Sequence, residues 1–322
     1  MSNLILRNSI LRGSVRSNSI PSAPRRTAPA ALAAVAVVAA LTLSGCAAGG
    51  AAQTESPAAV AEPTMAPIAE AAALVPADIR AAGVLRVAIP TNEPPTQYFR
   101  EGTEIMTGIN PDLARLVAGA LDLKIEIVVS TFDSIIPGLS ADRFDMTVSS
   151  MAVSKERLAA LDFVDYVKMG SALAVPAGNP GKLSITDLCG KKVAALTGSY
   201  QVTAYVPAMD AECAAAGKPA IVVGQFNDTR QAITSMASGR NDAVFADLPI
   251  LGHAAKQEPG IEIAGTKNVL PVGMGLPKGG QLTPAVAAAM KEIIHSAEYA
   301  AVLAKYGIEG GAITEARVNV PR

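Results

Sequence analysis

The stretch that decides the fold runs from Asp145 to Phe163 and reads DMTVSSMAVSKERLAALDF. It begins within a short apolar strand, expected over residues 144–148, which ends in small polar residues and leads to Arg157. Similar apolar runs recur on both sides of it, separated by segments whose apolar residues are spaced three and four positions apart, as in an amphipathic helix. This alternation predicts an α/β fold in which helices cover parallel sheets.

The expected elements form two sets of about 90 residues each. In the first set we expect strands over 85–89, 124–129 and 144–148, a helix through 121 that begins with Asn110 as cap and Pro111 in its first turn, and a short helix over 132–139. In the second set we expect strands over 192–196, 220–223 and 243–246, a helix from the cap Asp228 to 238, and a helix over 248–256. A strand over 272–276 and helices over 284–296 and 297–306 complete the chain.

Two such sets predict two lobes with a cleft between them, a type II periplasmic-binding-protein-like arrangement in which each lobe is a mostly parallel sheet flanked by helices. Gly and Pro cluster over 176–181 and 277–280, and we expect the crossovers between the lobes near these clusters. We assign the first lobe to 79–174, the second to 175–270, and a return segment of the first to 271–322.

The N-terminal segment indicates export from the cytoplasm. Arg25 and Arg26 precede a run of 16 almost uninterrupted apolar residues, 28–43, and Ser44, Gly45 and Cys46 follow. Sixteen residues are short for a bilayer span, which needs about 20, and suit a signal peptide over 1–45. A cysteine at this place is similar to the bacterial lipoprotein signal, in which the cysteine receives the lipid anchor, palmitate included. A short membrane anchor with an incidental cysteine is the alternative.

The rest of the chain, 46–322, is mildly acidic. It has 28 acidic and 22 basic residues, because five of the chain's 27 Lys and Arg lie before Cys46, and its net charge is near −6. Scattered charge of this sign argues against nucleic acid and anionic lipid as partners. Residues 46–78 are rich in Ala, Gly, Pro, Thr and Glu without apolar periodicity, which predicts a disordered tether.

After Cys46, two cysteines remain, Cys189 and Cys213. An even pair in an oxidising compartment predicts a disulfide. Metal binding is the alternative, but the only histidines, His253 and His295, are not at ligand spacing. We expect neither metal nor cofactor. The sequence also lacks GxxxxGK[ST], GxSxG, HExxH and GxGxxG. Binding rather than catalysis is therefore the leading class of function.

The stretch 145–163 resembles the solute-binding proteins of polar amino-acid ABC importers, known as family 3, in which a strand ending in small polar residues leads to an arginine and then to an Asp-Phe pair. Other segments match in the same order: GINPDL at 108–113, FDSIIPGL at 132–139, GKKVA at 190–194, DAVFAD at 242–247 and GMGLPKG at 273–279. The resemblance extends from about residue 85 to 311. It implies the two-lobed fold and a ligand bound in the cleft.

A free amino acid is a zwitterion, so its site needs a cation for the carboxylate and an acid for the ammonium group. The resemblance implies that Arg157 binds the carboxylate, for which a guanidinium is well suited, and that Asp247, on the other lobe, binds the ammonium group. A surface position for Arg157 and a helix-capping role for Asp247 are the alternatives. The further candidates are Phe132, an aromatic that packs against the ligand or belongs to the core; Ser150, Ala152 through its main chain, and Ser154 at the strand end; and Thr197, Gly198 and Ser199, whose N–H groups face an anion or form a plain turn.

The first pocket loop departs from the family pattern. Where relatives often have an acid and an aromatic, this chain has Pro90 and Glu93; Ala152 replaces a threonine and Ser150 a glycine. Glu93 either recognises a cationic or amide side chain or faces water. These departures leave the identity of the solute open.

We expect a monomeric lipoprotein on the outer face of the cell membrane that captures a polar amino acid by closure of the cleft and delivers it to the permease subunits of an ABC importer. A dehydratase or lyase on the same scaffold, with Glu93 as its acid, and a ligand-sensing subunit without transport are the alternatives.

Overall fold

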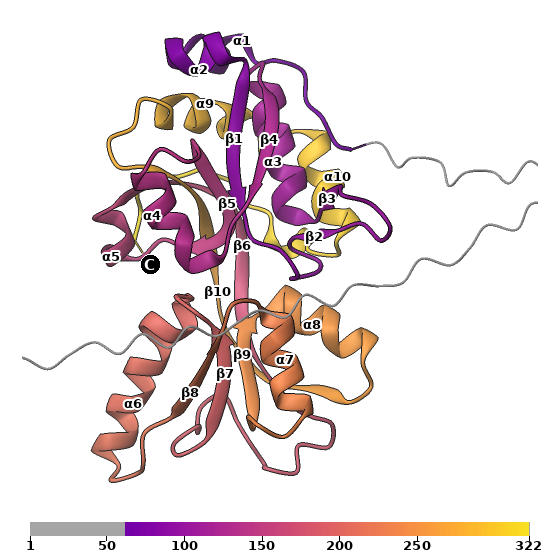
Figure 1. Cartoon of the computed structure of the whole chain (residues 1–322), viewed down its shortest axis with the longest axis vertical. Helices are drawn as coiled ribbons and strands as arrows, with labels where there is room; N and C mark the ends of the chain where they lie inside the picture. The colour runs from indigo at the N-terminus through magenta and orange to yellow at the C-terminus, as the bar shows by residue number, and fades with distance from the viewer. Residues whose placement is uncertain (1–61, 322) are drawn as a thin grey trace, which may run out of the picture. The chain divides into compact units, whose positions relative to one another are not determined.

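The computed structural model describes residues 62–321. Within them, two lobes share one eight-stranded sheet with the strand order β4-β1-β5-β10-β6-β9-β7-β8. At one end of this order β4, β1 and β5 are parallel, and at the other end β9, β7 and β8 are parallel. The antiparallel strands β10 and β6 lie between the two groups (Figure 1). The predicted α/β, two-lobed fold is confirmed.

The strands are β1 (Val84–Ile89), β2 (Tyr98–Phe99), β3 (Met106–Thr107), β4 (Lys124–Val129), β5 (Met146–Ala152), β6 (Leu161–Pro176), β7 (Lys192–Leu196), β8 (Val222–Phe226), β9 (Ala243–Asp247) and β10 (Ile261–Pro277). The α-helices are α1 (Ala69–Ala73), α2 (Ala77–Ala82), α3 (Ile109–Ala120), α4 (Ile135–Ser140), α5 (Lys155–Leu158), α6 (Val206–Ala215), α7 (Thr229–Ala237), α8 (Leu248–Gln257), α9 (Thr283–Ile293) and α10 (Ala297–Lys305). Short 3-10 turns cover Phe132–Ser134 and Glu309–Gly311, and a π-helical turn covers Gln201–Tyr205.

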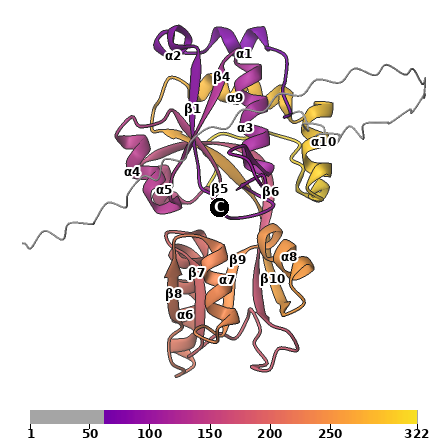
Figure 2. The same cartoon turned by 45° about the vertical axis from the view of Figure 1, so that its right-hand side comes forward.

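The two longest strands, β6 and β10, connect the lobes. They pair from Leu161 with Pro277 in the first lobe to Pro176 with Ile261 in the second, and Figure 2 shows both strands passing from one lobe to the other. The buried neighbours of β6 change at Gly170: Val167 and Met169 belong to the first lobe's core, whereas Leu173 belongs to the second lobe's core. The predicted crossovers at the Gly and Pro clusters are therefore wrong, because 176–181 and 277–280 lie at the outer ends of this strand pair.

Each lobe has its own core. In the first lobe, α3, α9 and α10 cover β1, β5 and β6 through apolar side chains such as Leu113, Met146 and Val286. In the second lobe, successive residues of β6 alternate between two clusters, with Leu173 in one and Ala174 in the other. A sheet buried on both faces needs apolar residues at consecutive positions, which explains the uninterrupted apolar runs in the sequence.

The predicted cap of α3 is wrong. The helix begins at Ile109 after Gly108, with no side-chain cap, and Asn110 is fully buried inside the first turn. Its side chain bonds Gln97 and Ser150 instead of the helix's own N–H groups. In contrast, Asp228 caps α7 as predicted, since its carboxylate accepts from the N–H of Gln231 at 2.8 Å.

The predicted tether is corrected where the structure describes it. Residues 62–78 include α1, whose Ala71 is buried together with Val75 in the first lobe's core, and the N–H of Ile68 donates to the carbonyl of Ala120. Small apolar residues therefore pack on α3 and α9, although they are too sparse to form a periodic pattern. The signal peptide, Cys46 and the first part of the tether lie outside the described residues.

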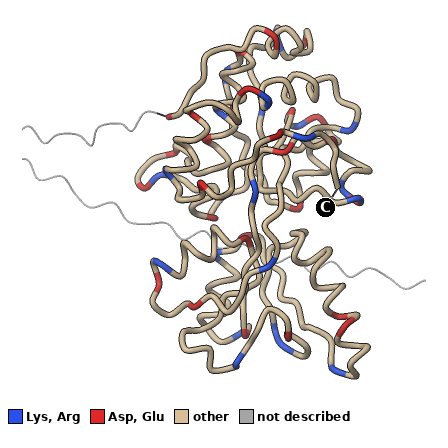
Figure 3. The backbone as a smooth tube through the Cα atoms, turned by 180° about the vertical axis from the view of Figure 1, so that it is seen from behind, with Lys and Arg blue, Asp and Glu red and all other residues tan. Residues whose placement is uncertain are grey.

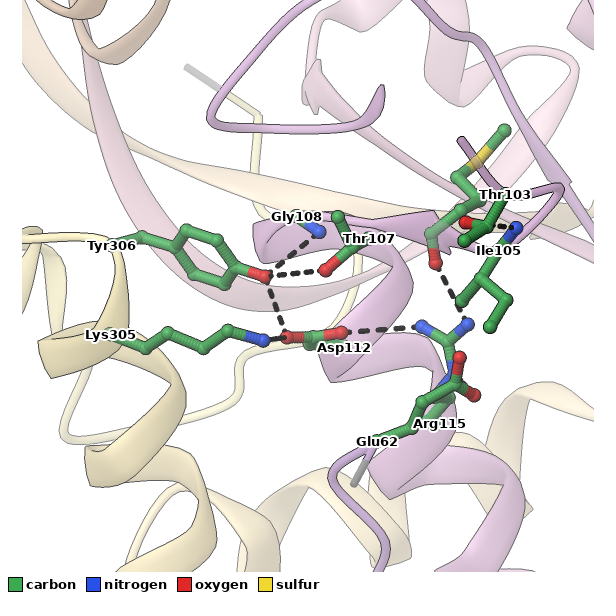
Figure 4. Close-up of polar contacts among 10 residues, drawn as sticks. Glu62, Thr103, Ile105, Thr107, Gly108, Asp112, Arg115, Lys305 and Tyr306 are labelled. Atoms are coloured by element: carbon green, nitrogen blue, oxygen red, sulfur yellow. Dashed lines mark hydrogen bonds and ion pairs between the residues drawn. The ribbon is translucent and has the colours of Figure 1, made fainter. Parts of the chain in front are cut away.

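An ion-pair network holds this part of the first lobe together (Figure 4). The buried carboxylate of Asp112 accepts from Lys305 and from the hydroxyl of Tyr306, both at 2.7 Å, so α3 is joined to the end of α10. Arg115, one turn along α3, pairs with Asp112 and, at 2.7 Å, with Glu62. These contacts join Glu62, near the start of the described residues, and Lys305 and Tyr306, at the end of α10, to the single helix α3.

The predicted disulfide between Cys189 and Cys213 is confirmed, with their Cα atoms 5.6 Å apart. It joins the segment before β7 to α6 and lies within the second lobe's core.

Charged residues of both signs are distributed over both lobes (Figure 3). Within 62–321, no helix is long and apolar enough to cross a bilayer, and no group of His, Cys, Asp and Glu is arranged to hold a metal ion.

Candidate ligand-binding cleft

A cavity between the lobes brings together most of the predicted site residues. Its lining includes seven of them: Glu93, Phe132, Ser150, Ala152, Arg157, Ser199 and Asp247. The first four and Arg157 belong to the first lobe, whereas Ser199 follows β7 and Asp247 ends β9 in the second. The carboxyl ends of parallel strands thus face one another across the cleft, as is usual for ligand sites in α/β folds.

Arg157 supplies the cation of this cavity. It lies in α5, which is capped by the hydroxyl of Ser154, and its side chain is 8% exposed. The guanidinium donates to the carbonyl oxygens of Ala152 and Gly198, each at 2.9 Å, so it touches both lobes. Burial lowers the pKa of Arg157 to about 10, and the negative charge of Asp247 opposes this effect. Arg157 therefore remains a buried cation at neutral pH, and its predicted alternative, a solvated surface position, is wrong.

Asp247 ends β9 on the opposite side of the cavity. Although it precedes α8, its side chain does not cap that helix. The carboxylate accepts instead from the Nε2 of Gln201 at 2.9 Å, and the same amide donates to Ser171. Burial raises the pKa of Asp247 to about 6, while the hydrogen bond from Gln201 and the charge of Arg157 act in the opposite direction. The capping alternative for Asp247 is thus excluded.

Glu93 is buried, with 3% of its surface exposed, rather than facing water. One carboxylate oxygen accepts from the hydroxyl of Thr229 at 2.7 Å and from its N–H at 3.2 Å, across the cleft. The other oxygen accepts from the Nε2 of Gln97 at 2.5 Å. Burial raises the pKa of Glu93 to about 7; the bonds from Thr229 lower it, and the charges of Asp247 and Asp228 raise it further. The cavity is thus lined by two carboxyl groups, those of Asp247 and Glu93, and one guanidinium cation, that of Arg157.

Phe132 belongs to a buried cluster with Ile135, Phe163 and Leu196, as one predicted role requires, and it also lines the cavity. Its packing against a ligand stays a prediction. Its ring lies 5.5 Å from the guanidinium carbon of Arg157, within the range of a cation–π contact. The ring therefore supports the buried cation from the first lobe.

The other predicted residues have different neighbours. The main-chain N–H groups of Thr197 and Ser199 donate to the carbonyls of Phe226 and Leu196, so neither is directed at an anion. For Thr197 and Ser199 the alternative prediction, a plain strand-to-helix turn, therefore holds. Gly198 offers its carbonyl to Arg157. Ser154 caps α5 and does not line the cavity.

The sequence reasoning missed several lining residues of the second lobe and of the connecting strands. They include Ser171, Tyr200, Gln201, Tyr205, Thr229 and Asn268. Two positional signals pointed to them: Tyr200 and Gln201 directly follow the turn 197–199, and Thr229 directly follows the predicted cap Asp228. The residues on β6 and β10 had no such signal, because β6 was not predicted and β10 was predicted only over 272–276.

Comparison with known proteins identifies the family. Residues 85–309 match the bacterial extracellular solute-binding proteins, family 3. An arginine-binding protein of Corynebacterium glutamicum is 31% identical over 255 residues, which cover 79% of this chain and 84% of that protein. The chain therefore belongs to family 3 of the bacterial extracellular solute-binding proteins.

Solved structures agree with this assignment. An ancestral arginine-binding protein bound to arginine is 30% identical, with a TM-score of 0.63 over 70% of this chain and 98% of that one. An ancestral amino acid-binding protein, described as a precursor of cyclohexadienyl dehydratase, is 27% identical, with a TM-score of 0.61 over 71% of this chain and 97% of that one. The relatives are binding proteins for amino acids, and this supports a polar amino-acid solute-binding role.

Proposed function

We propose that this protein binds a cationic amino acid, with arginine as the first candidate, in the cleft between its lobes. The observation that carries the proposal is the charge of the cavity, which is lined by one guanidinium, that of Arg157, and by two carboxylates, those of Asp247 and Glu93. The carboxylate of a bound amino acid would pair with Arg157 and its ammonium group with Asp247. Glu93 then remains for a positively charged side chain, and the relatives that are named for arginine support this choice.

The mechanism is closure of the two lobes on the ligand. Arg157 and Glu93 belong to the first lobe and Asp247 to the second, so one zwitterion satisfies both sets of charges only when the cleft is closed. Phe132 and Tyr200 line the same cavity, and aromatic side chains suit a planar guanidinium. A charge-assisted hydrogen bond contributes about 1.5–3 kcal/mol net, so three or four bring the affinity to the micromolar range, about −8 kcal/mol.

In the cell, we propose that Cys46 carries the lipid that anchors the protein to the outer face of the membrane after the signal peptide over 1–45 is removed. The monomeric protein then delivers its ligand to the permease subunits of an ABC importer. We also propose the lobes as the units that move. The first-lobe segments, expected over 79–174 and 271–322, flank the second lobe, and the first of them ends near Gly170 rather than at 174, because Leu173 and Ala174 belong to the second lobe's cores. A sensing subunit without transport is the alternative, and growth on the ligand as sole nitrogen source after deletion of the gene separates the two.

Isothermal titration calorimetry of the purified protein against the 20 amino acids, ornithine and citrulline tests this proposal. We expect micromolar binding of arginine and weaker binding of citrulline, its neutral isostere, because citrulline leaves Glu93 without a counter-charge. Preference for a neutral amino acid would refute the cationic assignment, and the absence of heat with every amino acid would refute the function itself.

One observation favours a second candidate. The pKa of Glu93, raised to about 7, is suited to a general acid, and one structural relative is described as the precursor of a dehydratase. NMR spectra of each bound compound after long incubation with the protein distinguish the candidates, since a binding protein leaves its ligand unchanged and a dehydratase or lyase does not.

A further inference from the structure

Glu93 lies at one end of a series of buried polar side chains. The proposed ligand contacts do not include the other members of this series. The members are Gln97, Asn110 and Tyr166, and each is at most 1% exposed. They come from three places in the first lobe: the loop after β1, the first turn of α3, and the middle of β6. The series begins at Ser150, which also lines the ligand cavity.

Four hydrogen bonds join these residues in a line. The N–H of Ser150 donates to the hydroxyl oxygen of Tyr166 at 2.9 Å, and that hydroxyl donates to the Oδ1 of Asn110 at 2.6 Å. The Nδ2 of Asn110 donates to the Oε1 of Gln97 at 2.5 Å and also to the hydroxyl of Ser150. The Nε2 of Gln97 donates to the Oε2 of Glu93 at 2.5 Å.

The direction of this line is fixed by its first donor. A main-chain N–H can only donate, so the oxygen of Tyr166 accepts from Ser150 and its hydrogen points to Asn110. The carbonyl of Asn110 is then the acceptor, and its amide nitrogen must face Gln97. Gln97 is oriented in the same way, with its N–H toward Glu93. Reversing any one amide would place two donors or two acceptors against each other in a buried site, which is costly.

We propose that Gln97, Asn110 and Tyr166 are positioning residues that keep Glu93 an acceptor-only carboxylate and thereby make the cleft selective for a cationic ligand over its neutral isostere. This inference rests on the proposed function for the nature of the ligand. The geometry supplies its physical basis, because the ionised form of Glu93 accepts from Gln97 and twice from Thr229, whereas a protonated carboxyl would lose one of these donors.

Other groups around Glu93 act against its ionisation. Asp247, on β9, and Asp228, at the start of α7, both raise its pKa through their negative charge, and burial raises it further. The cation of Arg157 lies in the same cavity but donates to Ala152 and Gly198. The hydrogen bonds from Gln97 and Thr229 are therefore the direct contacts that favour the charged form, and the first of them depends on the line of side chains behind it.

Three variants test the line at increasing distance from Glu93: Gln97→Met, Asn110→Leu and Tyr166→Phe. The first readout is the pH titration of the ¹³Cδ signal of Glu93 in the ligand-free protein. The second is the ratio of the affinities for arginine and citrulline. We expect the titration midpoint of Glu93 to rise in all three variants, and the affinity ratio to fall by about tenfold in Gln97→Met, since loss of one bond to a charged group changes an equilibrium by at least this factor.

Thr147→Val is the matched control. Thr147 is fully buried on β5, and its hydroxyl bonds the carbonyl of Ala88 and the hydroxyl of Ser149, neither of which is a member of the line. Its loss therefore perturbs the same core without altering the line's direction. We expect neither the Glu93 midpoint nor the affinity ratio to change in this variant. If Asn110→Leu does not fold, Tyr166→Phe, which removes a single oxygen, tests the same remote effect.

The outcomes separate the two proposals. If the midpoint moves only in Gln97→Met and not in the remote variants, Gln97 is a local contact and the inference is overturned. An equal loss of affinity for arginine and citrulline in all variants would indicate a purely structural role and overturn it too. If the wild-type protein binds no amino acid, the proposed function fails, and the Glu93 titration alone decides whether the line orients this carboxylate.

Discussion

The two walls of the cleft hold their charges in different ways. On the first lobe, Arg157 and Glu93 are nearly fully buried, and each takes part in two or three hydrogen bonds, with Ala152 and Gly198 and with Gln97 and Thr229, respectively. On the second lobe, Asp247 keeps a partly exposed side chain and accepts a single hydrogen bond, from Gln201. The difference indicates a rigid wall that selects the ligand and an adjustable wall that completes the contacts when the cleft closes.

The largest effect is expected from the rigid wall. Replacing Arg157→Ala removes both charge-assisted bonds to a ligand carboxylate, which are worth about 3–6 kcal/mol together, so arginine binding should fall by at least about a hundredfold. Calorimetry measures the loss, and thermal unfolding monitored by circular dichroism verifies that the fold is kept. Arg157→Lys is the control, since it keeps the charge without the paired geometry. Unchanged affinity in Arg157→Ala would contradict the role of this wall.

Glu93 should make the ligand-free protein less stable as the pH rises. Its pKa is about 7 in the folded protein and near 4.5 when unfolded, so the folded state binds more protons between these values. Each pH unit in this interval lowers the free energy of unfolding by about 1.4 kcal/mol, in total about 3 kcal/mol. Urea unfolding from pH 4.5 to 7 measures this slope. Asp247, whose pKa is raised to about 6, adds to the slope below pH 6. Glu93→Gln should therefore reduce the slope, most clearly between pH 6 and 7, and an identical slope in that variant would exclude Glu93 as a source.

A smaller effect is expected from the adjustable wall. Asp247→Asn keeps an acceptor for Gln201 but removes the charge opposite a ligand ammonium group, which should weaken arginine binding by about 2 kcal/mol, or about thirtyfold. Calorimetry at pH 7.5 gives the value. The wild-type affinity should also decrease as the pH falls toward the pKa of Asp247, about 6, and this pH dependence should be smaller in Asp247→Asn. The two walls would be equivalent if Asp247→Asn lost as much affinity as Arg157→Ala.

The smallest effect concerns the helix caps beside each wall. Ser154 accepts from the N–H of Arg157, and Asp228 accepts from the N–H of Gln231. Ser154→Ala and Asp228→Ala should each lower the free energy of unfolding by about 1 kcal/mol. If the first wall is rigid because its cap orients Arg157, only Ser154→Ala should also reduce ligand affinity. Denaturation and calorimetry on the same samples compare the two.

The sequence predicted the charged residues of both walls of this cleft. Arg157 and Glu93 lie close to β5 and β1, whose apolar runs were recognised, and Asp247 ends another recognised strand. Asn110 was assigned to a helix cap because Asn before Pro is typical of one, but burial places its side chain among tertiary partners. The local preference of Asn for a helix cap could not reveal that its hydrogen-bond partners are Tyr166 on β6 and Gln97 in the loop after β1.

The second limitation was the strand pair between the lobes, because β6 was not predicted and β10 was predicted only over 272–276. β6 is buried along almost its whole length, so it lacks the alternation of polar and apolar residues that marks a half-buried strand. The crossing part of β10 is partly exposed, and Lys267 and Asn268 interrupt its apolar residues. Gly170 and Ser171 interrupt the apolar run and conceal the continuity of β6. The lining residues of this region were therefore missed, together with the position of the crossovers.

The paired strands that join the lobes have a consequence for engineering. The chain enters the second lobe through β6 and leaves it through β10, and the two passages are neighbours, with Ser171 opposite Lys267. The whole second lobe is thus an insert whose ends meet, and it is suited to exchange between relatives as a single cassette. Such chimaeras would combine the first lobe of one protein, which carries Glu93, with the second lobe of another, which carries the residue equivalent to Asp247. The contribution of each lobe to ligand specificity could then be exchanged separately.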